Sequence, residues 1–424
     1  MLIAFKVNNF MSFADEQKLS MIPSLEGPGF ISLNNIKLLR AGVIFGANSS
    51  GKSNFIKAMA FGKDMALSGI SGRFRNKFSR VALENQNKES TFEYTLYSNG
   101  HYYSYGFSLV FYKGLFTGEY LYELTEDDQE ILLYERKGEE ISYHLELNEH
   151  ARTILSNLKE KILKSGLILH FVDELTDPAF EAFRNIASWF RNKLNIYFQD
   201  QEYLLLESDP LRHRERYLHF LKMFDTGITD FEEQKLDLSI LETLPLRVQE
   251  RIRSRLDCPG NMSFALRLSD ALYSINRNEG EVEIYAISFR HHNDFAYDFE
   301  EESDGTKRLF DLLDIIISPV PNAIYLIDEI NRSIHPLLTA EYLRLFKGSL
   351  RENNVQILFT THEVSLLRED LIRRDEIWFM EKQADASSRL FSLDIFKKEN
   401  QNNLSSSYLS GKYGGVPLFT DEEK

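Results

Sequence analysis

Hydrophobic and polar positions follow different patterns in different parts of the chain. Residues 2–13 and 90–147 alternate between apolar and polar, which is typical of half-buried strands. Turn residues such as Ser98-Asn99-Gly100 divide the second stretch into short segments, so it predicts an antiparallel β meander. From His150 to about Arg277 the apolar residues recur near helical spacing, and we predict that this stretch is mainly helical.

Three short segments are instead almost continuously apolar, at residues 38–45, 323–327 and 356–359. Runs of this length are typical of strands that are buried on both faces of a parallel sheet. The sequence therefore predicts an α/β fold with an antiparallel β meander and a helical insertion. We expect residues 1–150 to form the N-terminal lobe, 151–280 the helical insertion or lid, and 281–424 the C-terminal lobe.

The first apolar segment leads into residues 46–53, which match the phosphate-binding loop G-x-x-x-x-G-K-[ST]. The first glycine lets the chain turn sharply, and the second lets backbone N–H groups approach phosphates closely. The lysine reaches the β- and γ-phosphates, and the serine hydroxyl ligates Mg²⁺. The candidate ligands of ATP and Mg²⁺ in this segment are Gly46, Asn48, Gly51, Lys52, Ser53 and Asn54. A chance glycine-rich turn is the alternative, but the flanking strand and helix patterns argue against it.

The other two apolar segments end in residues that suit the chemistry of phosphate hydrolysis. Asp328 can ligate Mg²⁺ beside Ser53, and Glu329 can act as the general base that orients water. His362 can hydrogen-bond the γ-phosphate or the attacking water. The alternatives are a strand that ends in surface carboxylates and a surface histidine.

A fourth candidate lies at residues 301–308, where Ser303 or Asp304 can cap a following apolar helix. Gly305 permits a close backbone approach, and Thr306 follows it. We interpret Ser303, Gly305 and Thr306 as a second phosphate-binding helix start. The alternative is an N-capped helix without a ligand.

Composition and charge limit the classes of partner. The chain has 424 residues, a formal net charge of −15 and one cysteine, Cys258, which fits a reducing cytoplasm. The sequence contains no run of about 18 apolar residues, so we expect no membrane span. We also expect neither a signal peptide nor a membrane partner. The acidic charge restricts contact with nucleic acid to local basic patches, and the candidates are residues 73–77 and 212–216.

The order of these motifs resembles the ABC-class ATPases of the RecF, SMC and OLD group. Residues 9–13 resemble that group's N-F-x-S-F strand, 46–53 its Walker A loop, 303–306 its signature motif and 324–329 its Walker B strand, with His362 as the switch histidine. Residues 302–306, 335–336, 374–379 and 411–417 further resemble stand-alone AAA-type ATPases of anti-phage defence operons, such as those of Septu, retron and PARIS-type systems. The resemblance covers about residues 1–150 and 281–424.

The resemblance implies a homodimer or larger homo-oligomer in which ATP is bound between two subunits. Ser303 and Gly305 would then act on the nucleotide of the partner subunit. It further implies a sensor or scaffold that controls a separate effector protein, a nuclease or a toxin. The alternative is a RecF-like DNA repair or recombination ATPase that binds DNA directly. The signature segment lacks the Leu-Ser-Gly-Gly-Gln form of transporters, so we do not expect a transport subunit.

Overall fold

The computed structural model describes residues 1–33, 35–69, 74–125, 129–198, 200–292, 295–396 and 404–416. They divide into two compact units. The first unit comprises Met1–Tyr197, Asn322–Ile330 and Asn354–Lys424, and the second comprises Phe198–Pro321 and Asn331–Asn353. The units cut across the predicted segments, because residues 151–197 belong to the first unit and the expected C-terminal lobe contributes to both.

The first unit contains a seven-stranded antiparallel sheet. In spatial order its strands are β10 (Glu140–Tyr143), β9 (Glu130–Lys137), β8 (Leu115–Leu124), β7 (His101–Val110), β6 (Ser90–Ser98), β1 (Leu2–Asn8) and β2 (Gln17–Ser20). Strand β6 alternates strictly between buried and half-buried residues. The turn between β6 and β7 has positive φ at Asn99 and Gly100, as a two-residue hairpin requires. The predicted meander is confirmed; its expected turn at Asp127-Asp128 lies outside the described residues.

The second sheet of this unit has six strands and is mostly parallel. Its order is β11 (Leu194–Tyr197), β18 (Ile324–Ile327), β19 (Gln356–Thr361), β5 (Ala41–Phe45), β20 (Ile377–Lys382) and β21 (Ser388–Ser392), and only β21 is antiparallel to its neighbour. Every residue of β5, β18 and β19 is buried. The continuous apolar runs thus form the parallel core that the sequence predicts.

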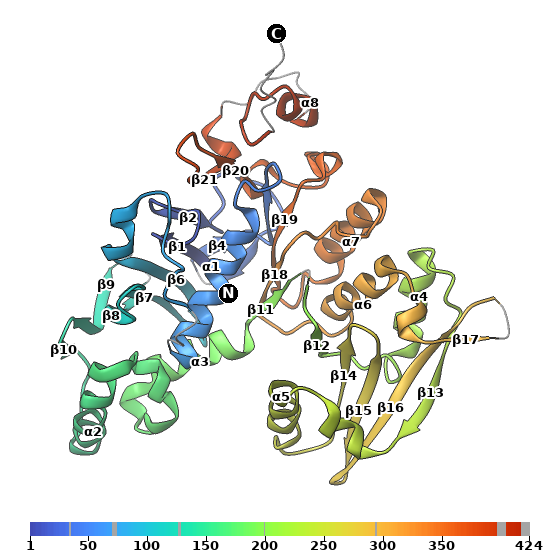
Figure 1. Cartoon of the computed structure of the whole chain (residues 1–424), viewed down its shortest axis with the longest axis horizontal. Helices are drawn as coiled ribbons and strands as arrows, with labels where there is room; N and C mark the ends of the chain where they lie inside the picture. The colour runs from blue at the N-terminus through green and yellow to red at the C-terminus, as the bar shows by residue number, and fades with distance from the viewer. Residues whose placement is uncertain are drawn as a thin grey trace. The chain divides into compact units, whose positions relative to one another are not determined.

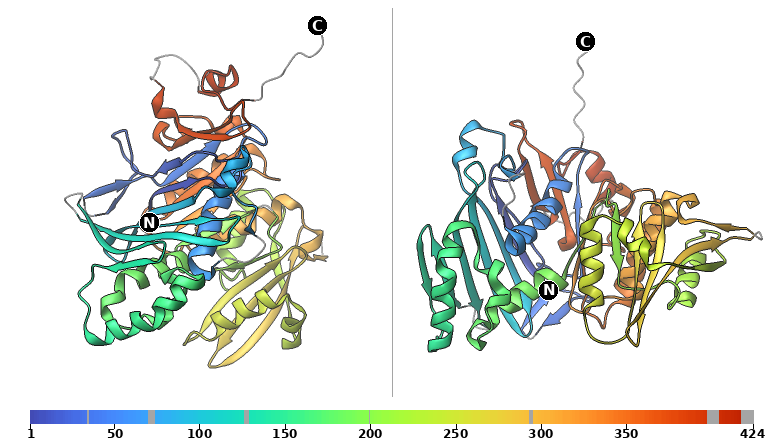
Figure 2. Two further views of the ribbon diagram at one scale, coloured as in Figure 1. Left: turned by 60° about the vertical axis from the view of Figure 1, so that its left-hand side comes forward. Right: turned by 60° about the horizontal axis from the view of Figure 1, so that its bottom comes forward.

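Helix α1 (Lys52–Ser68) lies between the two sheets of the first unit (Figure 2). The Phe55 ring on α1 packs edge-on against Phe5 of β1, with 5.5 Å between ring centroids. A buried side chain joins the sheets directly. Gln356 on β19 accepts a hydrogen bond from Leu2 N–H at 2.8 Å and donates to the carbonyls of Leu2 and Leu39 at 3.0 and 3.2 Å.

Helices α2 (Glu149–Ser165) and α3 (Glu181–Asn192) continue from the meander. Arg136 of β9 donates to the carbonyls of Ile162 and Gly166, which lie at the C-terminal end of α2. Glu119 of β8 accepts from Ile168 N–H at 2.9 Å, at the start of the 3₁₀ helix η3 (Ile168–Glu174). These two buried side chains thus provide hydrogen-bond partners for backbone groups at the ends of both helices.

The second unit is built on an antiparallel sheet with the order β12 (Tyr203–Leu206), β14 (Met262–Leu268), β15 (Leu272–Asn278), β16 (Glu281–Arg290) and β13 (Asp230–Leu236); β17 (Ala296–Tyr297) pairs with β16. The prediction that residues 150–277 are mainly helical is therefore wrong for β11 to β15. The α-helices described in the second unit are α4 (Arg214–Met223), α5 (Leu246–Leu256), α6 (Asp304–Ile317) and α7 (Pro336–Ser349). Figure 1 shows these elements along the chain.

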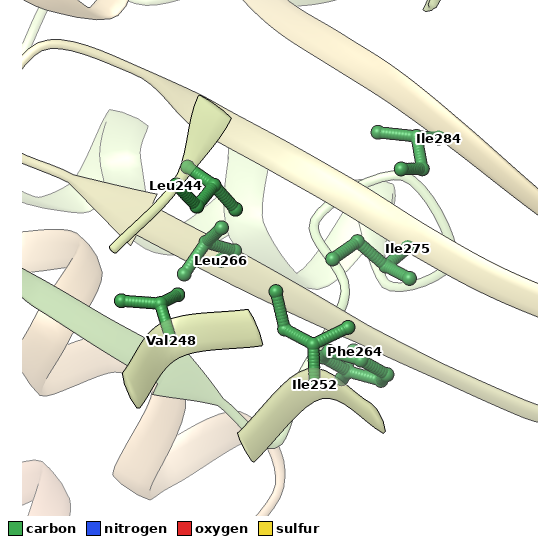
Figure 3. Packing of buried hydrophobic residues seen from close by; sticks show 7 residues of the cluster. All are labelled: Leu244, Val248, Ile252, Phe264, Leu266, Ile275 and Ile284. Carbon is green, nitrogen blue, oxygen red and sulfur yellow. The ribbon is translucent and has the colours of Figure 1, made fainter. Parts of the chain in front are cut away.

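The two faces of this sheet carry different helices. Val248 and Ile252 of α5 pack on Phe264, Leu266, Ile275 and Ile284 of one face, together with Leu244 (Figure 3). Phe289 lies five residues after Ile284 on β16, so it points to the opposite face. There it contacts Phe310 of α6, with 5.3 Å between ring centroids. Helix α6 is thus a central element of the second unit.

Short elements complete the described residues. They are β3 (Ile31–Leu33), β4 (Ile36–Leu38), η2 (Leu83–Asn87), η4 (Pro178–Phe180), η5 (Leu238–Thr243), η6 (Phe299–Glu301), η7 (Val364–Leu366), η8 (Arg374–Glu376), η9 (Leu393–Ile395) and α8 (Leu404–Leu409). Among the described residues, no helix has the length and apolar character needed to cross a membrane.

The buried carboxyl of Glu119 makes the stability of the first unit depend on pH. Burial raises its pKa from the ordinary 4.5 to about 7, against the hydrogen bonds from Ile168, Tyr105 and Tyr134 and the charge of Arg136, which lower it. The folded state therefore binds more protons than the unfolded chain between these two pKa values. The free energy of unfolding must fall as pH rises through this window.

We expect Glu119→Gln, which stays neutral, to remove this loss. From about pH 5 to about pH 8 the wild type should lose about 2 kcal/mol more free energy of unfolding than the variant. Denaturant titrations over this range measure the difference, with Glu139→Gln in an exposed turn as the matched control. Asp314 in the second unit, whose pKa burial also raises to about 7, affects all three chains alike. Parallel stability profiles for wild type and Glu119→Gln would contradict the assignment.

Candidate nucleotide-binding site

Three parallel strands bring the predicted motifs to one edge of the six-stranded sheet. Strand β19 lies between β5 and β18, with Thr361 opposite Phe45 and Phe359 opposite Ile327. The phosphate loop follows β5, Asp328 follows β18 and His362 follows β19. Because the carboxyl ends of parallel strands meet at the same edge, residues far apart in sequence share one site, as in other open α/β sheets.

The Asp328 carboxylate connects two of these strand ends and the phosphate loop. Its Oδ1 accepts a hydrogen bond from the Ser53 hydroxyl at 2.9 Å and from the Thr360 hydroxyl at 2.8 Å. The side chain is buried, at 4% exposure. The structure therefore brings together the two residues that the sequence predicts as Mg²⁺ ligands.

Glu329 follows in an unusual backbone conformation. Its φ is 47°, which is in the left-handed region, and its N–H donates to the Thr360 hydroxyl at 2.8 Å. Residues other than glycine adopt such a φ at a cost of about 1 kcal/mol or more, so surrounding contacts must hold it in place. The left-handed turn follows directly after Asp328. The Asp328 side chain is buried, whereas that of Glu329 is half-buried.

Lys52 is buried, and its ammonium group donates to the carbonyls of Gly46 and Ala47 at 2.8 and 2.9 Å. Burial lowers the pKa of Lys52, and the carboxylates of Glu329 and Asp328 raise it. The carboxylates thus favour the charged form that a phosphate ligand requires.

The phosphate loop is tightly packed, which explains its two glycines. Gly51 has φ 110°, and a Cβ atom there would collide with the Ser388 side chain. A Cβ atom at Gly46 would collide with the Met380 carbonyl. The Ser388 hydroxyl donates to Ser50 O at 2.6 Å, so strand β21 contacts the phosphate loop directly.

The remaining predicted residues of the first unit are placed as follows. Asn54 donates from its side chain to the Ser12 hydroxyl at 2.8 Å, which connects α1 with the N-terminal Asn-Phe-Met-Ser-Phe segment. In that segment Asn9 is buried and donates to the carbonyls of Asn85 and Lys88. Asn48 and His362 are exposed at the sheet edge that carries the site.

Ser303, Gly305 and Thr306 belong to the second unit, at the start of α6. The Ser303 hydroxyl accepts from Thr306 N–H at 3.0 Å and so caps the helix. A Cβ atom at Gly305 would lie 2.6 Å from the Ser333 carbonyl, so close backbone packing already requires this glycine. The N-capped helix is therefore present, and the role of these residues toward a phosphate stays a prediction.

Sequence reasoning missed Thr360, which orients both Asp328 and Glu329 through one hydroxyl. The available signal was a threonine pair at the end of an otherwise apolar strand, two residues before His362. Ser12 and Ser388 were missed as partners of the loop region, because their contacts join segments more than 40 residues apart.

The donor set fits Mg²⁺ bound together with a phosphate ligand. Mg²⁺ usually takes one or two carboxylates, waters and substrate phosphates, and not an all-protein cage. Asp328 and Ser53 supply one carboxylate and one hydroxyl. Among the described residues, no cluster of three or more His, Cys, Asp or Glu side chains could hold a metal ion. One carboxylate and one hydroxyl in contact fit a metal ion that is bound together with a nucleotide.

Comparison with known proteins supports the class that the motifs predict. No curated protein matches the sequence. Among solved structures, the "SmcHead bound to the C-winged helix domain of ScpA" is 14% identical over 93% of this chain and 99% of that chain, with a TM-score of 0.39. The "SMC head domain from Thermotoga maritima" is 15% identical over 92% and 98%, with a TM-score of 0.36. These likenesses are weak, and the assignment of family rests on a sequence model.

The model is described as "AAA domain, putative AbiEii toxin, Type IV TA system", and it matches residues 43–368. This span includes the phosphate loop, the signature segment, Asp328, Glu329 and His362, and it covers more than half of the chain. The description agrees with an ATPase that binds its nucleotide through a phosphate loop. The chain belongs to this family of AAA domains.

Proposed function

We propose that the chain binds and hydrolyses Mg-ATP between two copies of itself and thereby controls a separate effector protein in anti-phage defence. The observation that carries the nucleotide part is the 2.9 Å hydrogen bond between Ser53 and Asp328. It joins the helix that follows the phosphate loop to the acidic strand end. This is where a P-loop ATPase holds its metal ion.

Each residue of the site has a distinct part in the proposed reaction. Lys52 exchanges its two carbonyl partners for phosphate oxygens, and the N–H groups at the start of α1 face the anion. Ser53 and Asp328 would hold Mg²⁺, which neutralises charge on the phosphates. Glu329 orients the attacking water and accepts its proton, and His362 hydrogen-bonds the γ-phosphate or the water. Thr360 keeps both acids in position.

The dimer and the effector rest on the resemblance to defence ATPases and on the family description, which names a toxin of a type IV toxin–antitoxin system. In the proposed dimer, Ser303 and Gly305 of one copy complete the nucleotide site of the other. Ser303 is exposed at the start of α6, so a partner can reach it.

Direct DNA loading, as in RecF-like proteins, has less support. In the basic segment 212–216 every arginine is bound within the fold. Arg212 donates to Asn276 and Asn278, Arg214 pairs with Asp230, and Arg216 donates to Ile317 O. Of the other basic segment, Arg73 lies outside the described residues.

Lys52→Ala should weaken ATP binding about 10- to 100-fold, because a charged hydrogen-bond donor to the phosphates is lost. Isothermal titration with ATP measures the affinity. Lys57→Ala, on the exposed side of the same helix, is the matched control and should bind like the wild type. Equal affinity for all three proteins would remove the phosphate loop from the mechanism.

Glu329→Gln should bind ATP, turn over slowly and accumulate an ATP-dependent dimer, since the amide orients water but accepts no proton. Mass measurement in solution, with and without Mg-ATP, tests this. Adding the product of the neighbouring gene tests whether an effector joins the complex. A monomer with ATP bound would rule out the proposed dimer, and wild-type turnover would place the general base elsewhere.

Substitution of Ser303 by a charged residue tests whether Ser303 acts on the nucleotide bound by the partner subunit. Asp and Asn both cap helices well, so Ser303→Asp and Ser303→Asn should fold alike and differ in charge. We expect the Asp variant to bind ATP but to lose dimerisation and hydrolysis through repulsion of the γ-phosphate, whereas the Asn variant keeps partial activity. Mixing Ser303→Asp with Lys52→Ala should restore turnover, because one composite site is then intact. If mixing restores nothing, the residue does not act across a dimer.

A further inference from the structure

The segment that comprises α8 and residues 410–416, here called the C-terminal segment, is packed firmly on the first unit. The Tyr408 and Tyr413 rings stack on Phe379 of β20, with centroids 5.3 and 5.7 Å away and planes within 18° of parallel. Tyr408 also contacts Phe45, the last residue of β5 before the phosphate loop. Leu404, Ser407, Tyr408 and Tyr413 are buried.

This segment binds the phosphate loop through its backbone. Ala47 N–H, the second residue of the loop, donates to the Gly415 carbonyl at 2.8 Å. The same carbonyl accepts from the Tyr408 hydroxyl at 2.8 Å. Gly415 is buried and has φ 68°, and a Cβ atom there would lie 3.8 Å from Gly46 Cα. The preceding Gly414 has φ 69°, and a Cβ atom there would lie 2.6 Å from Glu381 Oε1. Lack of space and the left-handed φ both favour glycine at 414, whereas at 415 it is the left-handed φ that favours glycine.

The other end of the segment binds the loop that follows His362. The Ser405 hydroxyl, on α8, donates to the carbonyls of Val364 and Leu367 at 3.2 and 3.0 Å. These carbonyls belong to the short turn of η7, which begins two residues after His362. One compact segment therefore touches the loop that would cradle the phosphates and the loop that carries the candidate γ-phosphate contact.

We propose that the C-terminal segment is a positioning element for ATP hydrolysis, which holds the phosphate loop and the His362 loop in register with each other. This inference rests on the proposed ATPase function. The Ala47 N–H is already bound to Gly415, so this end of the loop stays fixed. Lys52, by contrast, can exchange its carbonyl partners for phosphate oxygens. Nucleotide binding then changes side-chain contacts and leaves the loop path unchanged.

The contact at Ser405 is tested by comparing Ser405→Ala with Ser410→Ala. In the part of the chain that the structure describes, the Ser410 hydroxyl donates to Ser407 O within the same segment, and Ser410→Ala is the matched control. We expect Ser405→Ala to lower kcat about three- to tenfold, because a looser His362 loop costs transition-state contacts. Its KM for ATP and its melting temperature should match those of the control.

The contact at Gly415 is tested by comparing Gly415→Ala with Gly411→Ala. Gly411 has a similar φ of 79°, and a Cβ atom there would meet only Val416, at an ordinary 3.6 Å. Both variants therefore carry a similar left-handed strain. Only Gly415 also holds the phosphate loop through its carbonyl, so only there can a shift that relieves the strain weaken the contact with Ala47 N–H. We expect Gly415→Ala to raise the Kd for ATP about tenfold over that of Gly411→Ala, with the melting temperature lowered equally in both.

The two comparisons separate the outcomes. If Ser405→Ala and Gly415→Ala behave like their controls while the wild type hydrolyses ATP, the segment only fills space and the inference is wrong. The same holds if the melting temperature of either variant falls below that of its control together with kcat or affinity, as general loosening would produce. If the wild type is folded but neither binds nor hydrolyses ATP, the proposed function itself fails, and the inference fails with it.

Discussion

The site depends on one buried carboxylate, that of Asp328, which connects three strand–loop junctions of the nucleotide sheet. Asp328 is satisfied by two hydroxyl donors, from Ser53 and Thr360, and both come from other strand–loop junctions. Burying a carboxylate is costly unless its oxygens are hydrogen-bonded, so the fold must bring these junctions together. The phosphate loop, the acidic strand end and the strand before His362 are therefore held in register before any ligand arrives. A divalent cation would then replace a neutral hydroxyl contact with a charge.

The residues whose spacing is dictated by chemistry could be predicted from the sequence. Gly46, Lys52 and Ser53 lie within eight positions, and short apolar runs precede both Asp328 and the segment that ends in His362, so local patterns suffice. Strands β12 to β15 could not be predicted in this way. Segments such as Tyr203–Leu206 show no alternation, and their identity comes from pairing with β14 and from packing on α5. Tertiary contacts decided between helix and strand there.

Contacts between distant backbone groups are the other limit of sequence reasoning. Neither the bond from Ala47 to Gly415 nor the cap that Gln356 provides for Leu2 follows from any local pattern. The start of α6 illustrates the converse difficulty. Gly305 is needed to pass the Ser333 carbonyl, so its presence has a packing cause whether or not a phosphate binds nearby. The fold and a phosphate ligand would both favour glycine at this position. Variants of the neighbouring Ser303 that change its charge but still cap the helix separate the two causes.

The bridge at Gln356 has a consequence for how the chain folds during synthesis. Strand β5 has β19 and β20 as its neighbours, and the Gln356 amide joins β1 to β19. The sheet around the phosphate loop therefore cannot form before residues 356–382 have been synthesised. Folding from the N-terminus onward is therefore impossible for the nucleotide sheet. In the meander, by contrast, β6 to β10 pair in sequence order, and β6 pairs in addition with β1. The apolar β5 strand stays exposed while the ribosome completes most of the chain. Pairing between segments so far apart in sequence is slow, so we expect this sheet to fold more slowly than its final packing would suggest.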